Sequence, residues 1–189
     1  MILNEAHEAL RTVVRNVPAD GWELPTPCTE WNVTQVLQHA AGDQIGYAAF
    51  ITGGPMPSEN PFAPSGTLSE AAEVVAEQAM KASADAWATV SPDAQEVPVP
   101  VPPNTMTYTL GIGACALDAA VHAWDIAMAT GQPSPLTPAM ARELLDIAKQ
   151  HIEPLRAYGV YAAELSREDG DDDVAVLLRY LGRDPRWSA

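Results

Sequence analysis

Basic residues are scarce in this sequence of 189 residues. Ten Lys and Arg stand against 25 Asp and Glu, which gives a formal net charge of −15. Such an excess of carboxylates repels phosphate backbones and anionic lipid headgroups, so we expect neither nucleic acid nor a membrane surface as a partner. Hydrophobic residues make up 47% of the chain and charged ones 19%, a balance typical of globular proteins. We therefore expect one domain spanning residues 1–189.

Cysteines and long apolar runs are also lacking. Cys28 and Cys115 are the two cysteines and form no CxxC pair, so a disulfide framework is not expected. Residues 1–14 carry charged side chains among the apolar ones, unlike a signal peptide. No later stretch approaches the roughly 18 uninterrupted apolar residues of a membrane helix. These absences predict a cytoplasmic protein.

Proline and glycine, by contrast, are frequent and divide the chain into helical segments. Thr29 is the expected N-cap of the second helix, and the alternating prolines of residues 97–103 force an extended connector. No internal repeat and no glycine-rich phosphate loop appears. The pattern predicts an all-α four-helix bundle with short accessory helices and a Pro-rich connector. Its apolar periodicity places helices over about 2–17, 30–52, 69–91, 109–130, 137–158 and 174–181.

Two polar residues interrupt the apolar fourth segment at helical spacing. Asp118 and His122 are four residues apart, so their side chains leave the same helix face one turn apart. On a solvated helix this spacing is commonly a surface pair. Residues 114–129 are otherwise almost entirely apolar, which indicates a buried helix. Burial of a carboxylate and an imidazole costs several kcal/mol unless each is paired or bound to an ion.

His39 is a similar anomaly on the second segment, where it stands among apolar residues. Taken alone, it would be a core histidine bonded to a backbone carbonyl. Taken together, His39, Asp118 and His122 are better explained as ligands of one divalent cation. Three protein ligands with an open fourth position are typical of a catalytic zinc-like site. Zinc and nickel both suit two histidines and one carboxylate.

Other polar residues near these three have alternative interpretations. Asp43 follows His39 by four residues and is either a fourth ligand, a hydrogen-bond partner of His39, or a solvated residue, the interpretation favoured here. Asp125 follows His122 by three and either accepts its second ring N–H or has a surface or capping role. Cys115 shares the face of Asp118, and a buried apolar filler is the usual state of such a thiol. His7 is expected to be solvated.

Several segments of the sequence resemble those of a known family. The segments that carry the resemblance are Thr26-Pro-Cys-Thr-Glu-Trp-Asn-Val33, Leu37-Gln-His-Ala-Ala-Gly42, Leu117-Asp-Ala-Ala-Val-His-Ala-Trp-Asp-Ile-Ala127 and the closing Leu181-Gly-Arg-Asp-Pro-Arg-Trp187. They are similar to an actinobacterial branch of the DinB-like superfamily, the metal-binding domain of mycothiol-dependent maleylpyruvate isomerase and its single-domain relatives. The resemblance implies a DinB-like bundle that holds a divalent cation through His39, Asp118 and His122.

The resemblance also has limits. The isomerase carries a second, sterol-carrier-like domain after the bundle, and this chain is expected to be too short for one. Maleylpyruvate isomerisation is therefore not carried over. The isomerase has Glu where this chain has Asp118, which brings the ion closer to its helix.

Three hypotheses for function remain open at this stage. The first is a metal-dependent transferase or isomerase that binds a low-molecular-weight thiol, mycothiol, to the ion as its thiolate. The second is a hydrolase with a metal-activated water and Asp43 or Asp125 as general base. The third is a non-enzymatic protein that binds metal or a small ligand. The substrate, the native metal and the oligomeric state, with a homodimer among the alternatives, stay undetermined.

Overall fold

The computed structural model describes residues 1–157 and 159–188 and confirms the predicted all-α fold. The described residues also form a small two-stranded antiparallel sheet. The elements, in chain order, are α1 (Ile2–Arg15), α2 (Val33–Thr52), α3 (Ala72–Ala88), β1 (Val97–Pro98), β2 (Thr105–Met106), α4 (Tyr108–Ala129), α5 (Pro138–Ala157) and α6 (Asp173–Tyr180).

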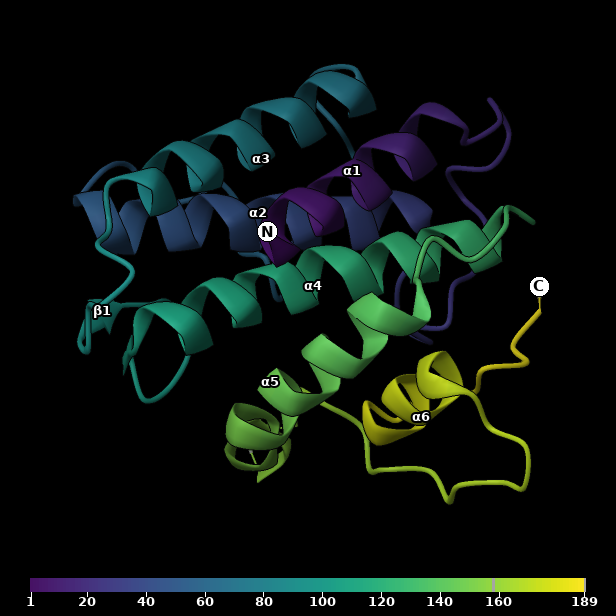
Figure 1. Ribbon diagram of the computed structural model, residues 1–189. Coiled ribbons are helices and arrows are strands. Elements are labelled where there is room, and N and C mark those ends of the chain that lie inside the picture. The colour runs from purple at the N-terminus through teal and green to yellow at the C-terminus, as the bar shows by residue number, and fades with distance from the viewer. Residues whose placement is uncertain (158, 189) are drawn as a thin grey trace.

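Helices α1, α2, α3 and α4 form the bundle, and α4 lies between the rest of the bundle and α5. Helix α4 packs against α1 and α2, while α3 covers α1 and α2 on the opposite side. Helices α5 and α6 pair with each other, and α5 crosses α4 on its remaining side (Figure 1). Because α4 has neighbours on every side, its apolar sequence is buried nearly all round.

Helix α4 is also long and apolar enough, by length and composition, to cross a membrane. However, 94% of the relevant window is buried within the protein itself. This burial accounts for its hydrophobicity, because the central helix of a bundle has no polar face. The apolar run of residues 114–129 is therefore part of the core of the fold.

Several helix boundaries differ from the predicted ones. Helix α2 begins at Val33 and not beside Thr29, because Asn32 and Gln35 form a capping box that satisfies the first free backbone N–H groups. Its end agrees with the prediction, and Gly53 adopts the left-handed conformation (φ 70°). The predicted end of α5, Tyr158, lies outside the described residues. Prediction also missed the pairing of β1 with β2, since a two-residue strand has no periodicity to read.

A buried polar network joins the four bundle helices. Each contributes one side chain, namely His7 of α1, Gln44 of α2, Ser83 of α3 and Cys115 of α4. Oε1 of Gln44 accepts hydrogen bonds from Ser83 Oγ at 2.8 Å and Cys115 Sγ at 3.2 Å, and it lies 2.8 Å from Nε2 of His7. Its amide nitrogen donates to the Cys115 carbonyl at 3.1 Å. The expectation of a solvated His7 is therefore wrong, and burial lowers the pKa of this imidazole.

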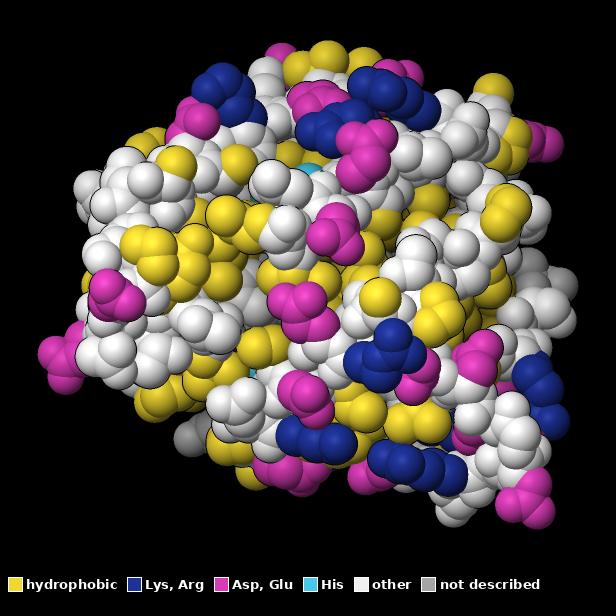
Figure 2. Space-filling view, viewed as in Figure 1, with side chains coloured by type: hydrophobic (Ala, Val, Ile, Leu, Met, Phe, Trp, Pro, Cys, Tyr) yellow, Lys and Arg dark blue, Asp and Glu magenta, His cyan; other side chains and the backbone are white. Residues whose placement is uncertain are grey.

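Charged side chains are intermixed on the molecular face shown in Figure 2, where Lys and Arg lie beside Asp and Glu. Arg11 pairs with Glu8 and Glu77, and Arg142 pairs with Asp173. Exposed pairs of this kind contribute little to stability, about 0–1 kcal/mol each.

The Gln44 network generates a first prediction. We expect Gln44→Leu to lower the free energy of unfolding by about 2–4 kcal/mol, because it leaves His7, Ser83 and the Cys115 carbonyl buried without their partner. Urea denaturation followed by circular dichroism measures the change. Gln150→Leu, on the exposed side of α5, is the control and should change stability by less than about 0.5 kcal/mol. Equal effects of the two substitutions would show that the network has no structural weight.

Candidate metal centre

His39 enters the site from the middle of α2 and is held on three sides. Its Nδ1 donates a hydrogen bond to the carbonyl oxygen of Pro61 at 2.8 Å. The Trp31 ring lies against it with centroids 4.8 Å apart, and Phe62 contacts it edge-on at 5.6 Å. Gly42 allows this approach, because a Cβ there would lie 2.8 Å from the Pro61 ring. With the hydrogen on Nδ1, the Nε2 atom of the neutral ring keeps its lone pair for a ligand.

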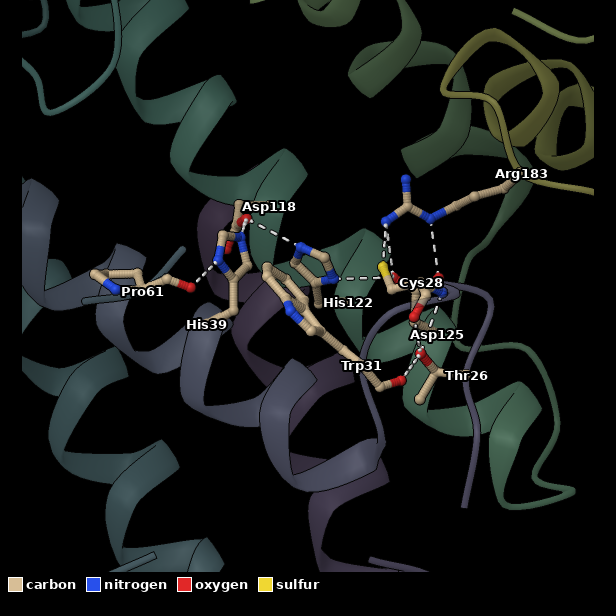
Figure 3. A network of polar contacts seen from close by, with 9 residues as sticks. All are labelled: Thr26, Cys28, Trp31, His39, Pro61, Asp118, His122, Asp125 and Arg183. Atoms are coloured by element: carbon tan, nitrogen blue, oxygen red, sulfur yellow. Dashed lines mark hydrogen bonds and ion pairs between the residues drawn. The ribbon is translucent and has the colours of Figure 1, made fainter. Parts of the chain in front are cut away.

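Asp118 and His122 come from one face of α4, as their spacing predicts. Oδ1 of Asp118 lies 3.3 Å from Nε2 of His122 and 3.4 Å from Nε2 of His39 (Figure 3). The two imidazole rings meet at 80°, with centroids 4.8 Å apart. All three side chains are buried, with at most 8% of any residue exposed. The structure thus brings together the three residues that the sequence nominated as ligands.

The spacing of these atoms fits a tetrahedral cation. Two ligands that are each about 2.1 Å from one ion lie about 3.4 Å apart in tetrahedral geometry. The two distances to Asp118 Oδ1 have this value, and one nitrogen or oxygen from each residue lies within 4.8 Å of the other two. Oδ2 of Asp118 is buried and has no hydrogen-bond partner in the described part of the chain. One carboxylate oxygen thus lacks a hydrogen bond, and two imidazole nitrogens lie beside the same carboxylate. Two nitrogens and a carboxylate are a donor set that suits a divalent cation such as zinc.

The pKa shifts of Asp118 and His122 also indicate that the buried carboxylate favours a positive charge beside it. Burial by itself would raise the pKa of Asp118, but the neighbouring imidazoles, His122 first, hold it below its ordinary value. Burial opposes charge on His122, but the Asp118 carboxylate raises the pKa of His122 well above its usual range. In the metal-free chain a proton on His122 therefore balances the buried carboxylate, and a cation would displace it.

A second group of potential ligands lies on the other side of His122. Asp125 Oδ2 accepts hydrogen bonds from His122 Nδ1 at 2.9 Å and from Cys28 Sγ at 3.2 Å. Arg183 donates to both oxygens of Asp125, at 2.9 and 2.8 Å, and lies 3.4 Å from Cys28 Sγ. Cys28, His122 and Asp125 are close enough to share an ion. The Arg183 guanidinium already balances the charge of Asp125, so among the described residues the group around Asp118 is the candidate cation position.

Asp125 therefore accepts the second ring N–H of His122, which was one of its two predicted roles. The prediction favoured for Asp43, a solvated side chain, is wrong. Asp43 is buried (8% exposed) and not solvated. No described residue forms a hydrogen bond with its carboxylate, and the Nδ1 of His39 bonds to Pro61 instead. Burial, and then the charge of Asp118, raise the pKa of Asp43 to about 7. Asp43 remains a candidate for proton transfer beside the three ligands.

Two further residues near the centre were not foreseen. Arg183 follows α6 and reaches Asp125 from 58 residues away in the chain. Tyr161, after α5, is near enough for Asp118 and Arg183 to affect its pKa, which burial raises above the ordinary value. A signal for Arg183 existed, because a buried Asp125 needs a cation and the chain has few. No comparable signal distinguishes Tyr161.

The raised pKa of Asp43 generates a second prediction. A folded-state pKa of about 7, against about 3.9 unfolded, means that the folded state loses stability as pH rises from 4 through 7. In the presence of a chelator, Asp43→Asn should therefore be more stable than wild type at pH 8 by on the order of 1–3 kcal/mol, with a much smaller difference at pH 5. Urea denaturation at the two pH values measures this. A difference that does not vary with pH would exclude a raised pKa at Asp43.

Comparison with known proteins places this chain in a family. The family model described as the mycothiol maleylpyruvate isomerase N-terminal domain matches residues 3–127. Two uncharacterized proteins of Mycobacterium tuberculosis, one from strain CDC 1551 / Oshkosh and one from strain H37Rv, are each 34% identical to the chain over 158 residues. The aligned region covers 82% of this chain and 79% of each relative. No solved structure matches the chain significantly.

The matched region contains all three nominated ligands, together with Asp43 and Asp125. It ends at residue 127, before α5, α6 and Arg183. The predicted family resemblance is confirmed: the chain belongs to the mycothiol maleylpyruvate isomerase N-terminal domain family.

Proposed function

We propose that this protein binds one divalent cation through His39, Asp118 and His122 and uses it in a transferase or isomerase reaction that depends on a low-molecular-weight thiol. The observation that carries the proposal is the unpartnered Oδ2 of Asp118 in a set of donors at tetrahedral spacing. Zinc is the proposed ion, and nickel is the alternative. Mycothiol is the proposed thiol, and its support is the description of the family.

A cation at this position would lower the pKa of a bound thiol and so supply a nucleophile at neutral pH. The chain's own residues would prepare the site for that chemistry. The Pro61 carbonyl and Asp125 hold His39 and His122 with Nε2 directed at Asp118. We propose Asp43 as the acceptor of the proton released by the thiol, because its pKa responds to the charges of Asp118, His39 and His122, whereas Asp125 is paired with Arg183.

A metal-dependent hydrolase is the second candidate, and the same observation on Asp43 favours it. An unpartnered carboxyl beside a cation site could equally take a proton from water. The two candidates differ in whether turnover requires a thiol. A third, non-enzymatic role in binding metal or a small ligand predicts neither reaction.

The metal proposal generates a third prediction. Purified protein, or chelator-treated protein reloaded with zinc, should contain about one ion per chain by elemental analysis. His39→Ala and Asp118→Ala should each weaken zinc binding by roughly 100-fold or more, because each removes one of three ligands. Zinc affinity should also fall as pH decreases, since protons compete for His122.

The matched control is His7→Gln, which alters a buried histidine on α1 outside the site. This variant should bind zinc like the wild type. Wild-type protein that holds no stoichiometric metal after loading would overturn the proposal.

The thiol proposal generates a fourth prediction, for protein loaded with cobalt(II) in place of zinc. Addition of mycothiol should produce a thiolate-to-metal charge-transfer band in the near ultraviolet, and His122→Ala should abolish it. Isothermal calorimetry with the zinc form should detect the same binding. If metal-loaded protein binds no thiol but hydrolyses activated esters without one, the hydrolase candidate replaces the first.

A further inference from the structure

The segment that follows α5 forms hydrogen bonds with Asp125, the partner of His122, through the guanidinium of Arg183. Helix α6 packs on α5, and Gly182 (φ 80°) turns the chain after it. A Cβ at Gly182 would lie 2.7 Å from the Ala162 side chain and 2.8 Å from the Ala163 carbonyl. This turn therefore packs tightly on the loop that precedes α6. After this turn the Arg183 side chain reaches Asp125 of α4 (Figure 3).

Arg183 is bound by Asp125 in a two-point contact. Its Nε donates to Oδ1 at 2.9 Å and its Nη2 to Oδ2 at 2.8 Å. Asp125 is fully buried, and the Arg183 side chain is 11% exposed. A bidentate contact of this kind fixes both the position and the plane of a carboxylate.

The orientation of Asp125 determines that of His122. Oδ2 accepts the hydrogen bond from His122 Nδ1 at 2.9 Å, which leaves Nε2 directed at Asp118. Without Arg183, the Asp125 carboxylate would be free to rotate, with Cys28 and His122 as its remaining donors. Residues that orient a ligand histidine in this way typically change metal affinity by about 10–100-fold.

We propose that Arg183 is a positioning residue of the metal centre, and that docking of the C-terminal segment, residues 172–188, is thermodynamically coupled to cation binding. This inference rests on the proposed cation site. Coupling between two sites is reciprocal, so a bound cation should hold the segment in place as much as the segment favours the cation. The family match ends at residue 127, so this contribution lies outside the region shared with the family model.

The test uses the full-length chain and two readouts. The first is zinc affinity, measured by competition with a chromophoric chelator. Arg183→Gln should bind zinc about 10–100-fold more weakly than wild type, whereas Arg186→Gln should stay within about twofold. Arg186 is a matched control because it lies in the same segment, is 69% exposed and pairs with Glu168 and Asp184.

The second readout is amide hydrogen exchange in residues 172–188 with and without zinc. Zinc should slow exchange there in the wild type and in Arg186→Gln, but have little effect in Arg183→Gln. A purely structural role of Arg183 would speed exchange equally in both conditions. If Arg183→Gln fails to fold, Arg183→Lys, which keeps the charge without the two-point contact, should show an intermediate loss of affinity.

The outcomes separate the two proposals. If the wild type binds no zinc, the proposed function fails. If the wild type binds zinc, and Arg183→Gln or Arg183→Lys binds it equally well with unchanged protection of residues 172–188, the positioning role fails and the metal site stands.

Discussion

Asp118 is a carboxylate in the middle of the most deeply buried helix of the protein, and its charge must be balanced there. Helix α4 is enclosed by α1, α2 and α5, so Asp118 has little exposure to solvent. The two imidazoles of His39 and His122 converge on the same oxygen, and the other oxygen has no hydrogen-bond partner within residues 1–157 and 159–188. The cation that we propose for this position would bind all three side chains, whereas a proton on one imidazole would balance only the charge. The surrounding structure serves to keep these atoms in place.

The supports around the centre come from segments far apart in the chain. The loop after α2 holds His39 through the Pro61 carbonyl, and the turn before α2 brings Cys28 to Asp125. The turn after α6 brings Arg183 to the same carboxylate. Arg183 thus holds Asp125, and Asp125 holds Nδ1 of His122. The Nε2 atom of His122, on the opposite side of the ring, lies at the candidate cation site. This separation keeps the positive charge of Arg183 away from the position proposed for the ion.

Sequence reasoning succeeded where periodicity and burial were informative. It predicted the all-α bundle, the central apolar helix and the convergence of His39 on Asp118 and His122. It failed where the outcome depended on packing between segments. Asp43 was expected in solvent near the end of its helix, yet the packing of α2 buries it. The cap of α2 was misplaced because Thr29 and Asn32 both suit that role, and only the folded turn selects Asn32.

The sequence by itself determined which residues would be costly to bury, because helical spacing and apolar neighbours are local properties of the chain. This was enough to nominate His39, Asp118 and His122. The tertiary structure decided how each charge is balanced, because the Pro61 carbonyl and Arg183 lie 22 residues from His39 and 58 residues from Asp125 respectively. No local pattern encodes which cation reaches a given carboxylate over such separations. Arg183 balances Asp125 on one side of His122, and Asp118 on the other side is the position that we propose for a metal ion.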